Sequence, residues 1–430
     1  MPWLKKTIHF IFAWAAYWYY GRPARKLIVV GVTGTKGKTT ASRLIASVLE
    51  AGGHTVGLLS TVEFQIGSDR RLNDKKMTML GRGKIQSMLR EMVRAGCTYA
   101  VVETSSEGIL QYRHYGLLYD ISVFTNLGTE HQERHGGFEN LKRDKGKIFK
   151  QLSLTPHKKI NGSLVDKVIV ANGDDSNASY YLSFAADKKY IFGLHPRNDN
   201  HLPELVASDI AATNNGVSFK VGAAQYALKI LGEFNVYNAL AAAAVGRSQN
   251  ISDNQIAAGL SAVTVVEGRM EEVRSSQPFR VFVDYAHEPL SFTELFTSLR
   301  RMVGSDKKVI AIIGSDGGGR DVGKRGKMGE IAGALTDVVV VTDVNCYDED
   351  PQQIAEMLAV GARRAGKEDG KNLFVIVDRR QAIAKAIELA LAGDVVVITA
   401  KGTEPYIAMA NGKKIPWDDR KVAQEILSAL

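Results

Sequence analysis

The junction between the first strand-like run and the first helical pattern constrains the fold more than any other part of the sequence. The apolar run LIVVGV leads directly into the glycine-rich segment TGTKGKTT, and a helical pattern follows. This order of strand, loop and helix is the context that a phosphate-binding loop requires. The strict pattern has glycine where this chain has Val32, so the loop is a variant.

Each residue type in this loop suits a nucleotide phosphate. Gly34 and Gly37 would let backbone N–H groups approach phosphate oxygens at a helix N-terminus. Lys38 would reach the β- and γ-phosphates, and Thr39 would offer its hydroxyl to Mg²⁺. We therefore predict that the loop binds ATP through these residues: Gly34, Thr35, Lys36, Gly37, Lys38, Thr39 and Thr40.

Further along the chain, short runs rich in Val and Ile alternate with longer helical stretches. Such runs, separated by helices, are typical of a parallel sheet in an α/β fold. The runs of the first half lie at 27–32, 98–103, 121–126 and 167–172. A second series lies at 279–286, 308–315, 337–344, 373–378 and 394–400.

We predict an α/β protein with three parts. An aromatic and basic segment occupies residues 1–25. A P-loop ATP-binding central domain with a mainly parallel sheet follows at 26–267, and a smaller Rossmann-like C-terminal domain at 268–430. The polar stretch at 195–204 is expected to be a loop or a strand-rich insertion within the central domain.

The composition favours a cytoplasmic globular protein. The chain is 45% apolar and 23% charged, and two cysteines are too few for a disulfide framework or a structural zinc site. The net charge of +9 favours anionic partners such as nucleotides, phosphorylated substrates or anionic lipid. Since the sequence holds no dense Lys/Arg block and no nucleic-acid-binding signature, we do not expect a nucleic-acid partner.

The N-terminal run at 8–20, IHFIFAWAAYWYY, has two interpretations of equal weight. It is shorter than the roughly 20 apolar residues that span a bilayer, and it lacks the cleavage site of a signal peptide. Its Trp and Tyr residues and its basic flanks suit peripheral contact with an anionic membrane. Alternatively, it is a helix that docks on the body of the protein.

Three residues are candidates for a metal site near the phosphates. Glu103 closes a strand-like run, His131 follows another, and Lys145 lies in a charged helical stretch. Taken singly they are weak, because strand-end acids and charge runs are usually solvated, and His135 is as eligible as His131. A lysine ammonium cannot bind Mg²⁺, but a carbamate on Lys145 would supply the hard oxygens that Mg²⁺ prefers.

The segment GVTGTKGKTT resembles the ATP loop of the Mur ligases, TGTxGKT. The stretch TNLGTEHQERHGGFENLKRDKGKIF resembles the family segment in which a histidine and a carbamylated lysine hold the second Mg²⁺. The resemblance implies that His131 and Lys145 take these roles and that Glu103 is the acid of the first metal site. It also implies catalytic roles for Lys38, Glu103, His131 and Lys145.

Further motifs follow in family order down to the C-terminus. The resemblance places Asn235 and Asn238 beside the adenine, Arg269 near the γ-phosphate, Asp284 on the ribose and His287 near the phosphates. Further matches to family motifs are Arg320, Asp321, Lys324, Arg325, Asp419 and Arg420.

Within the family, the chain is most similar to the branch that adds the third residue of the peptide. The S-S-x-x-x-x-Q-x-R segment of that branch implies that Ser105, Gln111 and Arg113 contact a nucleotide-sugar dipeptide, and we add Thr78 to this set. Only about 25 residues precede the first strand-like run, too few for a domain. The resemblance thus predicts a chain without the family's usual N-terminal UDP-binding domain, so the usual UDP recognition is not expected.

The amino-acid substrate is expected to lie near Asn345, Tyr347, Lys401 and Glu404, which fall in two further family motifs. In the branch that adds meso-diaminopimelate, an arginine pairs with the distal carboxylate of that substrate. Tyr347 stands at that position here. The acidic run 348–350 would favour a cationic side chain, although a solvated loop is as good an explanation. Lysine and ornithine are therefore alternatives to diaminopimelate.

The resemblance implies an ATP-dependent amide-bond ligase of peptidoglycan precursor synthesis. ATP and Mg²⁺ would be its cofactors, and a muramoyl peptide and an amino acid its partners. One alternative is a folylpolyglutamate synthase or a poly-amino-acid ligase of the same fold. Another is a P-loop regulatory ATPase that makes no amide bond.

Overall fold

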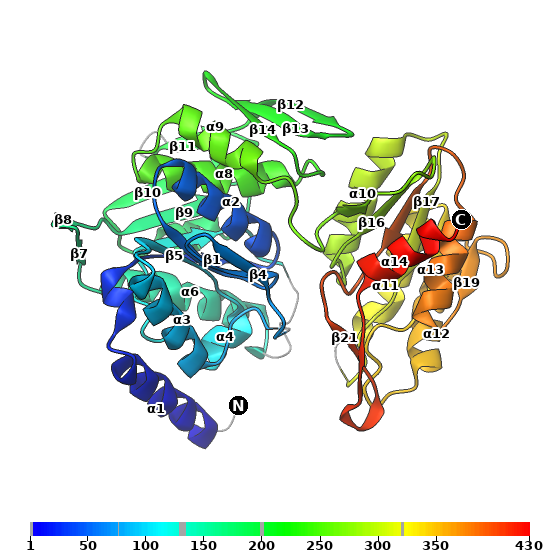
Figure 1. Cartoon of the computed structure of the whole chain (residues 1–430), viewed down its shortest axis with the longest axis horizontal. Helices are drawn as coiled ribbons and strands as arrows, with labels where there is room; N and C mark the ends of the chain where they lie inside the picture. The colour runs from blue at the N-terminus through cyan, green and yellow to red at the C-terminus, as the bar shows by residue number, and fades with distance from the viewer. Residues whose placement is uncertain (1–2, 76, 129–134, 198–201, 320–321) are drawn as a thin grey trace. The chain divides into compact units, whose positions relative to one another are not determined.

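The computed structural model describes residues 3–75, 77–128, 135–197, 202–319 and 322–430. The chain divides into two compact units, Met1–Thr264 and Val265–Leu430. Both are layered α/β structures with a sheet between helices (Figure 1). The predicted fold class is therefore confirmed.

A nine-stranded sheet forms the centre of the first unit, in the order β11-β10-β9-β6-β1-β5-β2-β3-β4. All neighbours from β11 to β2 pair in parallel, whereas β3 and β4 add an antiparallel hairpin at one edge. The strands are β1 (Ile28–Thr33), β2 (Val56–Leu59), β3 (Glu63–Ile66), β4 (Asp69–Leu72), β5 (Tyr99–Glu103), β6 (Ile121–Phe124), β9 (Val168–Asn172), β10 (Lys188–Gly193) and β11 (Glu204–Val206).

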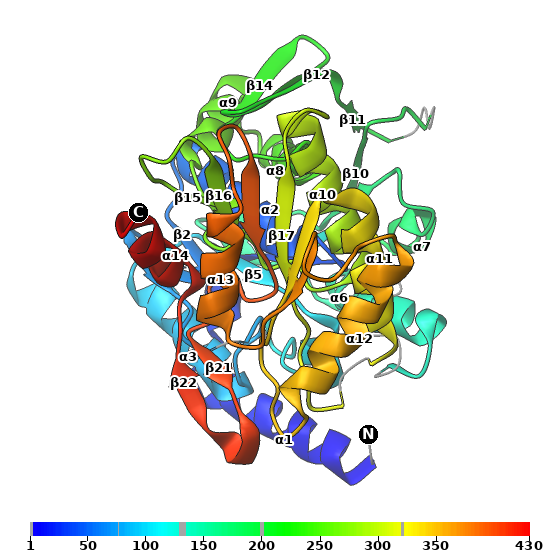
Figure 2. The same cartoon turned by 90° about the vertical axis from the view of Figure 1, so that its right-hand side faces the viewer.

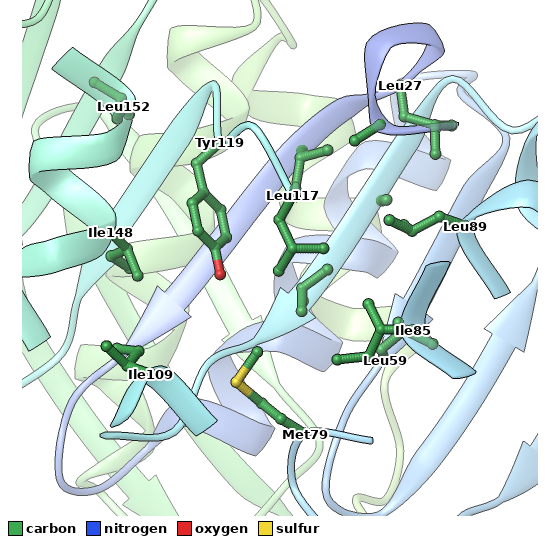
Figure 3. Close-up of a cluster of buried hydrophobic side chains, with 14 of the residues drawn as sticks. Leu27, Leu59, Met79, Ile85, Leu89, Ile109, Leu117, Tyr119, Ile148 and Leu152 are labelled. Atoms are coloured by element: carbon green, nitrogen blue, oxygen red, sulfur yellow. The ribbon is translucent and has the colours of Figure 1, made fainter. Parts of the chain in front are cut away.

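Helices cover both faces of this sheet (Figure 1). One face is covered by α2 (Lys38–Ala51) and α8 (Asn235–Ser248), and α9 (Asp253–Ala262) packs on these two helices. The other is covered by α3 (Arg82–Arg94), α4 (Ser106–Leu110) and α6 (Phe138–Leu154). Figure 3 shows part of the core on the second face, where Ile85 and Leu89 of α3, Ile109 of α4 and Ile148 and Leu152 of α6 point toward the sheet.

Smaller elements complete the first unit. A three-stranded antiparallel sheet follows β11, so the stretch predicted as a loop or strand-rich insertion leads into strands. Residues 198–201 of that stretch lie outside the described residues. The remaining elements are β12 (Ser208–Thr213), β13 (Gly216–Val221), β14 (Ala224–Leu228), the hairpin of β7 (Lys159–Ile160) and β8 (Ser163–Leu164), and α7 (Ala178–Leu182).

The N-terminal run forms α1 (Trp3–Tyr19), which packs on α3 and is followed by the short helix η1 (Pro23–Lys26). Ala13 and Tyr17 are buried, and the Phe10 ring contacts the rings of Tyr112 and Tyr115 edge-on. The docked-helix interpretation thus holds for one face of α1. Among the described residues, no helix has both the length and the apolar character needed to cross a membrane.

The second unit has a six-stranded sheet in the order β15-β16-β20-β17-β18-β19, parallel except for β15 (Figure 2). Its strands are β15 (Glu271–Val273), β16 (Arg280–Val283), β17 (Val309–Ile313), β18 (Val338–Val341), β19 (Leu373–Val375) and β20 (Val395–Ile398). Its helices are α10 (Pro289–Val303), α11 (Gly323–Leu335), α12 (Pro351–Arg364), α13 (Arg379–Glu388) and α14 (Asp419–Ser428). A hairpin of β21 (Tyr406–Ala408) and β22 (Lys414–Pro416), with the short helix η2 (Ala410–Gly412) between its strands, precedes α14.

Candidate active site

The predicted phosphate loop follows β1, in the middle of the large sheet, and leads into α2. Gly37 has a φ of 77°, the left-handed conformation that favours glycine. At Gly34 a Cβ would collide with the Thr125 hydroxyl and approach the backbone of Asn126. Glycine is therefore required at both positions, for conformation at one and for close approach at the other.

The end of β6 holds this loop in place. The backbone N–H of Thr35 donates to the Asn126 carbonyl at 2.9 Å, and that of Lys36 donates to Asn126 Oδ1 at 2.8 Å. Thr125 Oγ1 donates to the Lys36 carbonyl at 2.6 Å. Lys38 Nζ donates to the Thr35 carbonyl at 2.8 Å, so the lysine lies over its own loop.

Glu103, at the end of β5, lies beside the first turn of α2 and is 2% exposed. Thr39 Oγ1 is 3.1 Å from both of its carboxylate oxygens. Thr61, which follows β2, donates to the same carboxylate from its backbone N–H at 2.7 Å and from its hydroxyl at 2.9 Å. Thr40 is also buried, in the same turn of α2. The phosphate loop and the strand-end acid thus form one group, with Thr61 as a member that sequence reasoning missed.

Lys145 lies on α6 and is 3% exposed. Its Nζ donates to the carbonyl of Gly34 at 2.8 Å, which brings this lysine to the phosphate loop from 111 residues away in sequence. His135 lies shortly before α6 in the sequence. Its Nδ1 is 2.6 Å from Oδ2 of Asp144, which is on α6. His131 lies outside the described residues.

The two asparagines predicted beside the adenine lie in the first turn of α8 and are buried. Asn238 Nδ2 donates to Asn235 Oδ1 at 2.8 Å, and Asn235 Nδ2 donates to the Leu231 carbonyl at 2.6 Å. The Asn238 side-chain oxygen lies against Gly37, at the place a Cβ would take. Asn238 therefore lies beside the phosphate loop, and Asn235 holds its side chain.

The residues predicted to contact the donor gather around α4. Ser105 caps this helix by accepting from the Gly108 N–H at 3.2 Å. Gln111 Oε1 accepts two hydrogen bonds from Arg113, at 3.1 and 2.6 Å, and Arg113 also donates to the Met79 carbonyl. Next to Met79, Thr78 Oγ1 lies 2.9 Å from Thr61 Oγ1. We call Thr78, Ser105, Gln111 and Arg113 the donor cluster, after the donor substrate that they are predicted to contact. Thr78 and Thr61 link this cluster to Glu103.

A second arginine belongs to the donor cluster. Arg82 Nε donates to the Gln111 carbonyl at 2.9 Å. Burial lowers the pKa of Arg82, and the positive charge of Arg113 lowers it further; burial likewise lowers the pKa of Arg113. Two half-buried guanidinium groups that repel each other are suited to hold an anion between them. Sequence reasoning missed Arg82, although it opens α3 as part of the segment GRGK.

In the second unit, the candidates lie where parallel strands end. Asp284 follows β16, and its carboxylate accepts the N–H groups of Met270 at 2.8 Å and Ala286 at 2.7 Å. The guanidinium of Arg269 lies 4.7 Å from the centroid of the Tyr285 ring. Asp284 therefore joins the backbone before β15, next to Arg269, to the loop after β16 that carries Tyr285.

His287 is a neutral imidazole in this loop. Burial lowers its pKa to about 3, and the charge of Lys324 acts in the same direction. Because Nδ1 is 2.7 Å from the Tyr285 carbonyl oxygen, it carries the proton, and Nε2 is an acceptor. Lys324 itself pairs with Glu288. His287 thus contributes hydrogen-bonding capacity rather than positive charge.

The predicted amino-acid site forms a buried polar cluster in the second unit. Lys401 Nζ donates to Glu404 Oε2 at 3.1 Å and to the Tyr406 carbonyl at 2.9 Å. Asn345 Nδ2 donates to Asp316 Oδ1 at 2.7 Å and to Glu404 Oε2 at 3.0 Å. Asn345, Lys401 and Glu404 are therefore brought together as predicted, and Asp316 is an additional acid that sequence reasoning did not identify.

The structure gives the acidic run 348–350 structural roles. Asp348 Oδ1 accepts the Asn411 N–H at 2.9 Å, Glu349 pairs with Arg325 at 2.9 Å, and Asp350 caps α12. Tyr347 has a φ of 52° and its ring lies beside Gly318. The negative charge closest to Asn345 comes instead from Asp316 and Glu404.

Of the other motif residues, Asp419 and Arg420 form ion pairs within the second unit. Asp419 is buried and pairs with Arg379 at 2.7 Å, and Arg420 contacts Asp418 at 2.8 Å. Arg320 and Asp321 lie outside the described residues.

Comparison with known proteins identifies the family. Residues 32–246 match the Mur ligase middle domain, and residues 268–402 match the Mur ligase glutamate ligase domain. A UDP-N-acetylmuramyl-tripeptide synthetase of Roseiflexus sp. (strain RS-1) is 38% identical over 425 residues, which cover 96% of this chain and 81% of that protein.

Other relatives carry related names. A UDP-N-acetylmuramoyl-L-alanyl-D-glutamate–2,6-diaminopimelate ligase of Geobacillus kaustophilus (strain HTA426) is 36% identical over 416 residues, with coverage of 94% and 80%. A solved structure of a ligase with the same name aligns with a TM-score of 0.62 at 28% identity and covers 94% of this chain and 78% of its own. The predicted resemblance, including that to the tripeptide-forming branch, is confirmed. The chain thus belongs to the Mur ligase family of ATP-dependent ligases.

Proposed function

We propose that this enzyme adds an amino acid to a UDP-N-acetylmuramoyl-dipeptide-like donor, using ATP and Mg²⁺, as a step of peptidoglycan precursor synthesis. The phosphate loop of the first unit would bind the ATP phosphates, the same unit would bind the donor, and the second unit would bind the amino acid. The names of the relatives support this substrate class. The observation that carries the proposal is the grouping of the phosphate loop, the Thr39–Glu103 pair and Lys145 at one end of the central strands.

The donor set around this loop fits Mg²⁺. Glu103 and the hydroxyls of Thr39 and Thr61 supply hard oxygens next to a phosphate-binding loop. Lys145 fits only as its carbamate, since an ammonium has no acceptor. A carbamate on its Nζ would supply oxygen acceptors beside the phosphate loop, where the ammonium now donates to Gly34. Bound Mg²⁺ would neutralise charge that develops on the transferred phosphoryl group.

The chemistry proceeds in two steps. A carboxylate oxygen of the donor attacks the γ-phosphorus of ATP, the bond to the β-phosphate oxygen breaks, and ADP leaves. The amine of the incoming amino acid then attacks the acyl carbon, and the tetrahedral intermediate loses inorganic phosphate and a proton to give the amide. Arg82 and Arg113 would orient the anionic donor, while Lys38 would stabilise the charge on the phosphates.

An ADP-release assay tests this proposal. ADP should form at an appreciable rate only when the donor and an amino acid are both present, because the acyl-phosphate needs an acceptor amine to turn over. A product gaining the mass of one amino acid less water should accumulate in equal amount. ADP release that is independent of both substrates would contradict the proposal and would favour a P-loop ATPase without ligase activity.

The choice of amino acid is a separate prediction. Tyr347 offers no fixed charge for the distal carboxylate of diaminopimelate, whereas Asp316 lies beside Asn345 and suits a distal ammonium group. We expect lysine or ornithine to be ligated faster than alanine, and Asp316→Asn to reduce that preference by about tenfold or more.

Rates with meso-diaminopimelate, lysine, ornithine and alanine would decide between these substrates. Asp348→Asn is the matched control, because its carboxylate holds Asn411 instead. A strong preference for meso-diaminopimelate that is unchanged by both Tyr347→Phe and Asp316→Asn would show that a different part of the enzyme selects the substrate.

A further inference from the structure

The outward face of α1 is a continuous apolar surface. While Ala13 and Tyr17 are buried, seven residues at helical spacing on the opposite side are exposed. Phe12 is 63% exposed and Tyr19 is 78% exposed. The face consists of Ile8, Ile11, Phe12, Trp14, Ala15, Trp18 and Tyr19, and it includes no charged residue.

Such a face differs from ordinary exposed apolar residues. Single exposed apolar side chains are common on globular proteins, but contiguous apolar patches usually mark an interaction site. At 100° per residue, these seven positions form one stripe along the helix from Ile8 to Tyr19. The stripe contains two Trp and one Tyr, residues that favour the boundary between water and lipid.

Positive charge adjoins this stripe at the C-terminal end of α1. The guanidinium of Arg22 lies 4.6 Å from the centroid of the Trp18 ring. Arg25 and Lys26 of η1 are both exposed. Between Thr7 and Leu27 the chain has no acidic residue to offset these charges. The helix therefore presents an apolar face next to a cluster of cations. The apolar face suits the acyl chains of an anionic membrane, and the cations suit its headgroups.

We propose that α1 binds the enzyme to the surface of a membrane that contains anionic lipids. The stripe would enter the boundary between headgroups and acyl chains, and Arg22, Arg25 and Lys26 would contact lipid phosphates. With 17 residues, α1 is about 26 Å long, which is short of the roughly 30 Å of a bilayer core, so it lies in the surface. Phe10 contacts Tyr112 and Tyr115, and Ala13 and Tyr17 are buried, so the docked side of α1 leaves the stripe available.

Co-sedimentation of the full chain with vesicles tests this proposal. We expect binding to vesicles of phosphatidylcholine mixed with phosphatidylglycerol, weaker binding to pure phosphatidylcholine, and a decrease with rising salt. The emission of Trp14 and Trp18 should shift to shorter wavelength on binding. Ile11→Ser combined with Phe12→Ser should lower the partition coefficient by roughly tenfold or more, because two large apolar side chains are lost.

Matched variants separate surface chemistry from general effects. Leu154→Ser with Leu164→Ser removes two exposed apolar side chains elsewhere in the same unit and should leave binding unchanged. Arg25→Glu with Lys26→Glu should weaken binding to the anionic vesicles by about fivefold or more for each charge. Arg71→Glu with Lys150→Glu, which alters two exposed charges outside η1, should have little effect.

Three results would overturn the proposal. The first is absence of binding to anionic vesicles. The second is binding that is equal with neutral and anionic vesicles and unaffected by the Arg25 and Lys26 changes. The third is a wild-type dimer in sedimentation velocity that the Ile11 and Phe12 changes dissociate, without vesicle binding, since a second copy would then cover the stripe. ADP release by every variant without vesicles verifies that each is folded.

Discussion

At the scale of single residues, Lys145 is the sharpest test of the site. Its buried Nζ contacts the Gly34 carbonyl, so removal of the side chain takes away either a cation or a carbamate next to the phosphates. We expect Lys145→Ala to reduce ligation by about 100-fold or more. Added short-chain carboxylates or bicarbonate should restore part of the rate if a carbamate is the active form.

Lys150→Ala is the control for this experiment, because Lys150 lies on the same helix but is exposed. The rate of ADP release at saturating donor and amino acid is the measurement. Turnover at the wild-type level in Lys145→Ala would remove this lysine from the site.

His114 makes the stability of the first unit depend on pH. Burial lowers its pKa to about 4, and the charge of Lys147 adds to the effect. An unfolded histidine has a pKa of about 6.5. Between these values the unfolded chain binds a proton that the folded chain does not. The free energy of unfolding should therefore fall as the pH drops from about 6.5 to 4, by up to about 3 kcal/mol.

Urea unfolding at a series of pH values measures this dependence. His114→Gln cannot take up the proton, so its free energy of unfolding should change less over the same pH range. His157→Gln is the control, because His157 is exposed and pairs with Asp187 at the surface. Equal pH dependence in the wild type and in His114→Gln would mean that His114 is not responsible.

At the scale of secondary-structure elements, several buried strands could be predicted, whereas the short strand β2 and the hairpin β3–β4 could not. The runs predicted at 27–32 and 98–103 correspond to β1 and β5, shifted by one residue or less at each end. Strands covered on both faces by helices need apolar residues throughout, which leaves a clear signal. The hairpin β3–β4 gives no such signal, because β4 is exposed and reads DRRL.

The candidate site shows the same division. Glycine, lysine and threonine of the phosphate loop were predictable because one local segment determines their geometry. Thr61 and Arg82 were not, since each joins the site through contacts with residues 42 and 29 positions away. A threonine after a strand and an arginine opening a helix are too common to indicate function by themselves.

A buried ion cluster fixes the opposite ends of the central strands. Asp120, which precedes β6, accepts from Lys158 at 2.6 Å, from Lys167 at 2.9 Å and from the backbone N–H of Val29 in β1 at 2.9 Å. Burial lowers the pKa of Lys158 to about 8 in spite of the attraction to Asp120. The carboxylate therefore compensates two ammonium groups that have little access to water.

We expect Asp120→Asn to lower the free energy of unfolding of the first unit by about 3–5 kcal/mol, because buried positive charge loses its partner. Urea unfolding, together with hydrogen exchange of the β1 amides, would measure the change. Asp166→Asn breaks an exposed pair with Lys188 and should cost about 1 kcal/mol or less. Similar losses in the two variants would contradict a special role for the buried cluster.

At the scale of the whole molecule, each compact unit has its own apolar core. The core of the second unit joins β16, β17 and β20 to α13 and α14, and it includes Ile310, Ile383 and Val422. The strands of each sheet come from one unit only. A unit with a closed set of strand pairs and its own core satisfies the requirements for independent folding.

We therefore predict that a fragment comprising residues 265–430 folds on its own. It should show mixed helical and strand circular dichroism and a single cooperative urea transition, because no strand among its described residues pairs with a strand of the other unit. Arg379→Ala, which strands the buried Asp419, should destabilise the fragment and the full chain by the same amount, about 3–5 kcal/mol. Arg380→Ala breaks only an exposed pair and should have little effect in either. A fragment without cooperative unfolding, or one in which the Arg379 change has a different cost, would show that the second unit draws stability from the rest of the chain.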